Sequence, residues 1–89
     1  MKIKNNFIKI TKEDGLKEVF GHNGGPMHIE SSQDMAVVFQ ISDIAWAKNR
    51  TYPNGRQERK VYLQKAGRSL SLELTPSAFN TLEEIIFKN

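Results

Sequence analysis

The fold is decided by residues 44–74, which read IAWAKNRTYPNGRQERKVYLQKAGRSLSLEL. Two turn signals divide this stretch into three segments. In Tyr52–Arg56 the proline presets its φ for the first central position of a type I turn, and Gly55 suits the left-handed position that follows. Lys65–Arg68 carries a glycine that tolerates a positive φ. The stretch therefore predicts three consecutive antiparallel strands joined by two short turns.

The alternation of apolar and polar residues assigns side chains to the two faces of this sheet. On one face we expect an apolar set that a helix covers: Val61, Leu63, Leu70, Leu72 and Leu74. On the other we expect a more polar set: Tyr62, Gln64, Ser69, Ser71 and Glu73. Ile44 and Trp46 fall on one side of the first strand, so we expect Trp46 to belong to the core.

Residues 75–88 have the pattern of an amphipathic helix. Thr75 is a hydroxyl N-cap, and Pro76 occupies the first helical position. One apolar stripe recurs at helical spacing, formed by Ala78, Phe79, Leu82, Ile85 and Ile86. We therefore expect an α+β fold. A mainly antiparallel sheet of four to five strands, which includes the antiparallel strands of residues 35–74, would pack one face against the C-terminal helix.

The N-terminal residues 1–34 carry weaker signals, and we expect them to be largely irregular. Phe7–Thr11 alternates like a strand. Leu16–Phe20 has three apolar residues at helical spacing, which predicts a short helical turn, with a strand as the alternative. Further along we expect a mobile loop at Gly21–Pro26. A brief strand at Met27–Glu30 and a turn at Ser31–Asp34 would follow it.

Met35–Ile41 is nearly all apolar. Such a run is typical of a strand that is covered on both faces, or of a strand at the contact between two copies of the chain. The sequence thus leaves open whether this segment is buried within one chain or in a homodimer.

Composition limits the class of protein. The chain has 89 residues, which make one domain, residues 1–89. It has no cysteine, which excludes disulfides and thiolate zinc sites. No apolar run is long enough to span a bilayer, and charged residues interrupt any signal-like segment near the start. We expect a cytoplasmic protein that does not contact membranes.

Positive charge is concentrated in the predicted hairpins. Residues 48–68 hold seven cations and one acid, a net charge of +6, whereas the whole chain carries +3. Cations on strands can neutralise phosphates, and aromatic rings between them can stack unpaired bases. The candidate nucleic-acid-binding residues are Lys48, Arg50, Tyr52, Arg56, Arg59, Lys60, Tyr62, Lys65 and Arg68. The alternative use is protective, because lysine and arginine on sheet edges also block edge-to-edge association.

The sequence shows no set of residues typical of an enzyme or a metal site. His22 and His28 are the only histidines, and their spacing matches no usual metal site. The glycines at 21, 24 and 25 lack the Gly-Lys-Ser/Thr ending of a phosphate loop. No spacing around a serine suggests a nucleophile elbow. We predict a non-enzymatic binding protein without a cofactor or a metal.

The last predicted strand and the helix resemble the positive-cofactor-four type of transcriptional coactivator, through Gly67–Leu72, Thr75-Pro76, Phe79 and Leu82. That family has a curved four-stranded antiparallel sheet followed by one C-terminal helix, and it binds single-stranded DNA as a dimer. The resemblance, which covers residues 37–86, implies the same fold and ligand here. It departs from the family at Phe79, where the family has tryptophan. Residues 41–46 are also similar to the strand opening of the LytTR type of bacterial DNA-binding domain.

Three functions follow from these patterns. The first is binding of a nucleic acid, most simply single-stranded DNA or RNA, through the basic hairpin. The second is interaction with an acidic protein surface, in the manner of a small phage or mobile-element inhibitor. The third is a small oligomerising scaffold, with Met35–Ile41 as the homodimer contact.

Overall fold

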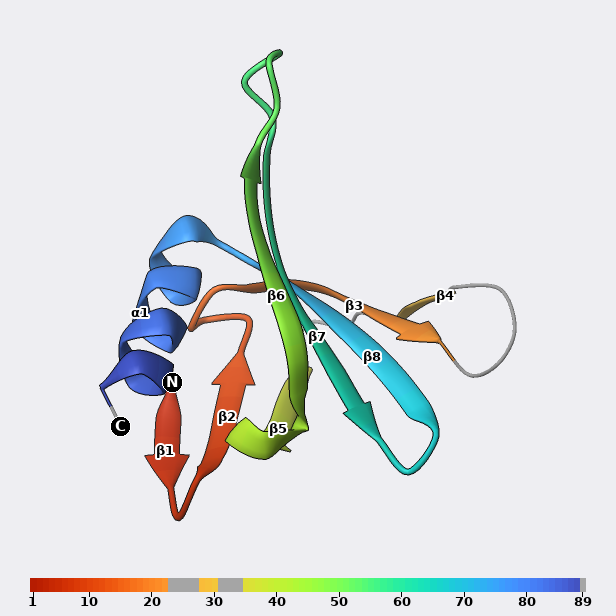
Figure 1. Cartoon of the computed structure of the whole chain (residues 1–89), viewed down its shortest axis with the longest axis vertical. Coiled ribbons are helices and arrows are strands. Elements are labelled where there is room, and N and C mark those ends of the chain that lie inside the picture. The colour runs from red at the N-terminus through yellow and green to blue at the C-terminus, as the bar shows by residue number, and fades with distance from the viewer. Residues whose placement is uncertain (23–27, 31–34, 89) are drawn as a thin grey trace.

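The computed structural model describes residues 1–22, 28–30 and 35–88 (Figure 1). In chain order its elements are β1 (Lys2–Lys4), β2 (Phe7–Thr11), β3 (Leu16–His22), β4 (His28–Glu30), β5 (Ala36–Gln40), the 3-10 turn η1 (Ile41–Asp43), β6 (Ile44–Thr51), β7 (Gln57–Lys65), β8 (Arg68–Leu74) and α1 (Pro76–Phe87). The predicted α+β class is confirmed. Most of the predicted Gly21–Pro26 loop and the whole Ser31–Asp34 turn lie outside the described residues.

The larger sheet contains the predicted three-stranded meander and has the strand order β4-β3-β8-β7-β6, with all neighbours antiparallel. Its register places Val61 beside Leu72 and Leu63 beside Leu70, so the predicted apolar face is confirmed. At the β6–β7 turn the amide of Gly55 donates to the carbonyl of Tyr52 at 2.9 Å, and Gly55 has a φ of +87°. The turn therefore has the geometry that its proline and glycine predict.

A second sheet, which the sequence did not predict, has the order β1-β2-β5. Ile8 lies opposite Phe39 in its register, and both side chains are buried. Val38, the residue before Phe39, lies on the other face of β5 and is 59% exposed. The expectation that Met35–Ile41 is covered on both faces is therefore wrong within one chain, because only one face of β5 meets the core.

One apolar core joins the two sheets and the helix. Ala78, Phe79 and Leu82 are the buried residues of α1, and they belong to the same cluster as Leu72 and Ile8. The helix contacts β7 and β8, as its predicted position on the leucine face requires. Thr75 is the N-cap, and its hydroxyl accepts a hydrogen bond from the amide of Ala78 at 3.2 Å.

The turn before β3 fits closely against the start of the helix. The carbonyl of Gly15 accepts a hydrogen bond from the amide of Thr75 at 2.9 Å. Gly15 has a φ of +111°, and a Cβ at this position would lie 2.7 Å from the Cβ of Ala78. Only glycine satisfies both the backbone conformation and this close approach.

The N-terminal third is more regular than the sequence predicts. Residues 2–22 contain three strands, so the expected irregular segment is wrong, and Leu16–Phe20 is part of β3 rather than a helical turn. The register between β3 and β8 shifts between Leu16 and Glu18, which marks a β-bulge. One extra residue in a strand puts Leu16 and Val19 on the same buried face, and this spacing of three imitates a helix.

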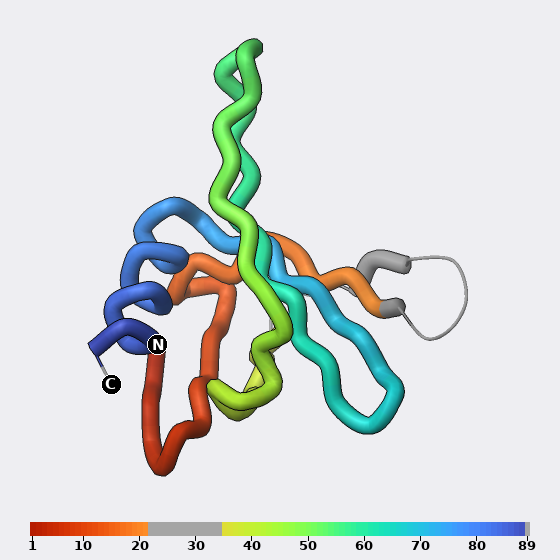
Figure 2. The backbone as a smooth tube through the Cα atoms, viewed as in Figure 1, coloured from red at the N-terminus to blue at the C-terminus, as the bar shows by residue number. Residues whose placement is uncertain are grey.

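The β6–β7 hairpin extends well beyond the rest of the molecule, as the backbone trace shows (Figure 2). The turn between β7 and β8 lies at the opposite end of β7 from this projecting tip (Figure 2). Within the described residues, no helix is long and apolar enough to cross a membrane.

Candidate nucleic-acid interface

An aromatic pair stands on the sheet face opposite the leucines, which we call the outer face. Trp46 on β6 lies directly opposite Tyr62 on β7. Their ring centroids are 3.9 Å apart and the rings are inclined by only 10°, so they are stacked. Trp46 is nevertheless 53% exposed. The expectation that Trp46 belongs to the core is therefore wrong.

A second β-bulge explains the position of Trp46. Ile44 pairs with Leu63, but Trp46 pairs with Tyr62, so the register shifts by one residue at Ala45. A bulge reverses the alternation of side chains beyond it. Ile44 therefore packs against the core, whereas Trp46 joins Tyr62 on the outer face.

A shallow hollow of about 230 Å³ adjoins the aromatic pair. Gln64 and Ser69 line it with polar groups, and Leu63 and Leu70 line it with apolar groups. Pockets for whole small-molecule ligands begin near 300 Å³. This hollow is thus suited to one planar group stacked beside an aromatic ring.

Three of the predicted cations share the outer face with the aromatic pair. Lys48 lies opposite Lys60 in the row next to Trp46, and Arg50 lies in the following row toward the hairpin tip. The Nζ atom of Lys60 is 4.9 Å from the ring centroid of Phe20, in a cation–π contact. Glu73 lies opposite Lys60 on the β8 side. The positive charge is therefore concentrated on the part of the face that belongs to the projecting hairpin.

Glu58 organises the charged groups of the hairpin. Its side chain is buried, with the residue 5% exposed, and Lys48 approaches it at 2.8 Å and Arg56 at 3.9 Å. The Tyr52 hydroxyl donates a hydrogen bond to the same carboxylate at 3.0 Å. The bond from Lys48, assisted by that from Tyr52, holds the pKa of Glu58 below its ordinary value. Reciprocally, Glu58 raises the pKa of Lys48.

Tyr52, a predicted base-stacking residue, already has partners within the chain. The guanidinium of Arg50 lies 4.6 Å from the centroid of its ring, and that of Arg56 lies 5.5 Å from it. Together with the bond from its hydroxyl to Glu58, these contacts fix the ring at the hairpin tip. Tyr52 thus holds two arginines in place.

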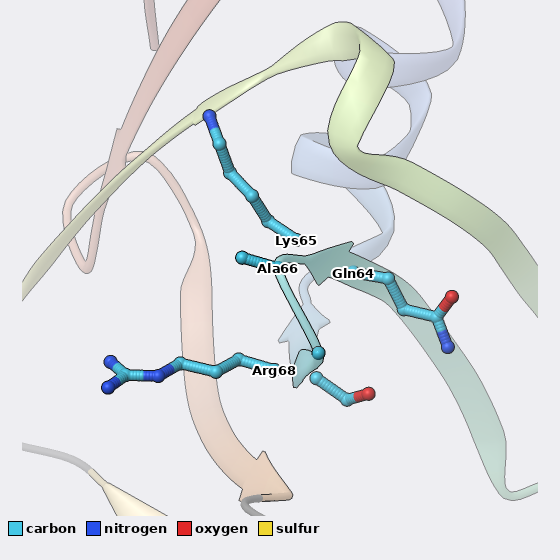
Figure 3. Close-up of a pocket in the computed structure, with 6 residues that line it drawn as sticks. Gln64, Lys65, Ala66 and Arg68 are labelled. Atoms are coloured by element: carbon cyan, nitrogen blue, oxygen red, sulfur yellow. The ribbon is translucent and has the colours of Figure 1, made fainter.

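The remaining predicted cations lie elsewhere. Arg59 is the neighbour of Lys60 on β7, so its side chain lies on the opposite face, the one that carries the leucines. Its Nη1 atom is buried without a hydrogen-bond partner among the described residues. Lys65 and Arg68 flank the β7–β8 turn (Figure 3), which lies at the opposite end of β7 from the hairpin tip (Figure 2). The Nζ atom of Lys65 donates to Gln40 Oε1 at 3.3 Å and lies 3.9 Å from Asp43.

The structure therefore brings together six of the nine predicted site residues and separates three. The six are Lys48, Arg50, Tyr52, Arg56, Lys60 and Tyr62, and we call them, with Trp46 and Glu58, the hairpin site. Sequence reasoning missed Trp46 because a bulge cannot be read from simple alternation. Three lysines, Lys2, Lys4 and Lys9, also lie exposed on one face of the small sheet and were not predicted.

No group of three or more histidine, cysteine or acidic side chains is placed to hold a metal ion in the described parts of the chain. The hairpin site combines a stacked aromatic pair, a polar hollow and clustered cations. No protein-family model, curated protein or solved structure matches this chain, so its function is inferred from the geometry of this site.

Proposed function

We propose that the hairpin site binds single-stranded nucleic acid. The observation that carries this proposal is the stacked pair of Trp46 and Tyr62, of which Trp46 is exposed, on the face that also bears Lys48 and Lys60. An aromatic surface can continue its stack with an unpaired base, and each such contact contributes about 1–3 kcal/mol. The cations beside it neutralise phosphates of the same strand.

The arrangement favours a single strand over a duplex. In a duplex the flat faces of the bases are stacked on one another, so no base face is free to stack on the exposed indole of Trp46. The hollow next to Tyr62 accepts one planar group, with Gln64 and Ser69 able to hydrogen-bond its edge. Because every base has a flat face, this mode of binding tolerates many sequences.

The test is a titration with labelled oligothymidylate and its RNA counterpart, of about 15 nucleotides each, a length within the usual range of site sizes. Trp46 is the only tryptophan of the chain, so its fluorescence reports directly on the site. We expect quenching on binding, and we expect Trp46→Ala to weaken binding about 5- to 150-fold, the equivalent of one lost stack.

Two matched controls sharpen this test. Phe87→Ala removes another exposed aromatic ring, 80% exposed at the end of α1, and should leave the affinity unchanged. Lys60→Ala should reduce the slope of log affinity against log salt by about 0.7, whereas Lys88→Ala should not change it. Equal affinity of the wild-type and Trp46→Ala proteins, or no binding at about 50 mM salt, would refute the proposal.

A further inference from the structure

β5 presents an open edge to solvent. It is the outermost strand of the three-stranded sheet, so one of its two edges has no neighbouring strand in the described part of the chain. Its sequence, Ala36–Gln40, contains no charge and no proline, and its register with β2 is regular throughout. Edge strands are usually protected by charges, prolines or bulges, because a bare edge pairs readily with another strand. Within β5 none of these protections is present, although the Asp43 carboxylate just beyond it occupies the outward amide of Gln40.

The hydrogen bonds at the end of β5 show which amides point to that open edge. The amide of Ile41 donates to the Asn6 carbonyl at 2.9 Å, whereas the amide of Gln40 donates to the Asp43 carboxylate at 2.9 Å. Bonding to the neighbouring strand alternates along an antiparallel ladder. Two residues before Gln40, the N–H and C=O groups of Val38 therefore also point away from β2, toward the open edge.

A hollow of about 710 Å³ lies along this edge, between β5 and the β7–β8 turn. Its apolar wall is formed by Val37, Phe39, Leu63 and Leu70. Lys65 and Arg68 line it at the turn, and Figure 3 shows both side chains extending to the same side of the turn while Gln64 extends to the other. Backbone bonding groups, an apolar wall and two cations thus meet in one elongated site.

We propose that this site, the β5 groove, binds an extended peptide with an apolar part and an acidic part, which pairs with β5 as an added strand. The apolar side chains would contact Phe39, Leu63 and Leu70. Lys65 and Arg68 lie on the same face of β7 and β8 as these leucines but nearer the turn, so the carboxylates would belong to the half of the peptide beside the turn. Asp43 also lines the groove, but its carboxylate accepts the Gln40 amide and lies near Lys65, so the rim remains positive.

A second copy of this chain fits the groove less well than a separate peptide. The β7–β8 turn closes the side of the groove opposite β5, and the β5 of a second copy carries the same turn beside it. Pairing of two copies would also bring two sets of Lys65 and Arg68 into one place, where like charges repel. Charge complementarity therefore selects an acidic strand as the partner.

The test uses a fluorescein-labelled peptide about eight residues long, with valines in one half and aspartates in the other, which spans β5 at ~3.3 Å per residue. One control peptide has asparagine in place of aspartate, and a second has lysine in place of aspartate. We expect only the acidic peptide to bind, and we expect its binding to slow hydrogen exchange at the Val38 amide.

Protein variants separate backbone pairing from charge. Val38→Pro removes the outward N–H and should abolish peptide binding, whereas Val38→Ala keeps the N–H and should retain it. The double variant Lys65→Glu/Arg68→Glu leaves the ladder intact and should weaken binding at least about tenfold. It therefore decides the question even if Val38→Pro does not fold, as circular dichroism would show.

Several results would overturn the peptide proposal. They are equal binding of the asparagine peptide, undiminished binding to Lys65→Glu/Arg68→Glu, and a dimer in sedimentation that Val38→Pro dissociates. Leu63, Gln64, Ser69 and Leu70 line both the β5 groove and the hollow beside Tyr62, but Val38 lines only the groove. Val38→Pro should therefore bind oligothymidylate like the wild type. Loss of nucleic-acid binding in Trp46→Ala with retained peptide binding would separate the two proposals.

Discussion

Replacing Glu58 with glutamine should strengthen the binding of single strands, because it removes the one carboxylate of the hairpin site. Four cations of that site, Lys48, Arg50, Arg56 and Lys60, now stand against Glu58, a net charge of +3 that becomes +4 in the variant. Glu58 is ionised at neutral pH, since its partners lower its pKa. For single strands, log affinity falls with log salt by about 0.7 for each phosphate neutralised.

The expected slope therefore changes from about −2.1 to about −2.8 if each net charge engages one phosphate. With affinities that converge near 1 M salt, Glu58→Gln should bind about eightfold more tightly at 50 mM salt and about threefold more tightly at 200 mM. At the same time the variant loses its ion pairs with Lys48 and Arg56, so its free energy of unfolding should fall. Affinity and stability thus move in opposite directions.

The assay is a fluorescence titration at several salt concentrations, with urea unfolding measured on the same preparations. The matched control is Glu84→Gln, which makes the same change of net charge on the exposed side of α1. It should leave both the slope and the affinity close to those of the wild type. A Glu58→Gln variant with an unchanged salt slope would refute the assignment of these cations to phosphate binding, as would an equal gain in Glu84→Gln.

Two further predictions concern the folding of the chain. Gly15→Ala should lower the free energy of unfolding by about 1–3 kcal/mol from its positive φ alone, and by more because the new Cβ would crowd Ala78. Gly55 also has a positive φ, +87°, but has open space around it, so Gly55→Ala in urea unfolding measures the cost of the backbone conformation without crowding. Asp14 accepts hydrogen bonds from the N-terminal amine and the Thr11 amide, which hold its pKa below the ordinary 3.8. Its contribution to stability is therefore present above that pH and lost as the pH falls through the lowered pKa, so the stability difference between the wild type and Asp14→Asn should vanish in acid. Unfolding curves recorded from neutral pH to about pH 2 would show a constant difference if this reasoning is wrong.

The parts of the fold that could be predicted from the sequence are those with local signals. The turn at Tyr52–Arg56 carries its proline and glycine at the positions that the backbone requires, and Thr75 with Pro76 marks the start of α1. The alternation of leucines in β8 is uninterrupted, so its buried face was assigned correctly at Leu72 and Leu74. Ser71, however, is 2% exposed although it belongs to the outer face, where it lies between Tyr62 and Phe20.

The parts that could not be predicted depend on long-range pairing. Two β-bulges, near Lys17 and Ala45, each shift the alternation by one residue, and nothing in the local sequence marks them. Because of these bulges, the spacing of apolar residues in β3 resembles that of a helix, and simple alternation places Trp46 on the core face. The three-stranded sheet also depends on long-range pairing, because β5 pairs with β2, a strand about thirty residues earlier. Closing a loop of this length costs little free energy, but no local pattern in the sequence marks which segments will pair.

The projecting end of the β6–β7 hairpin gives the chain a region that can change without disturbing the leucine core. Beyond Lys48 and Lys60 the two strands pair with each other rather than with β8, whose register with β7 ends at Lys60. Substitutions or a chemical label at Asn54 and Gly55 would leave the leucine core untouched, because both residues are exposed and a Cβ at Gly55 would have no atom within 4 Å. Descendants of this sequence could therefore acquire new ligand preferences by changing the length and composition of this tip while inheriting the body unchanged.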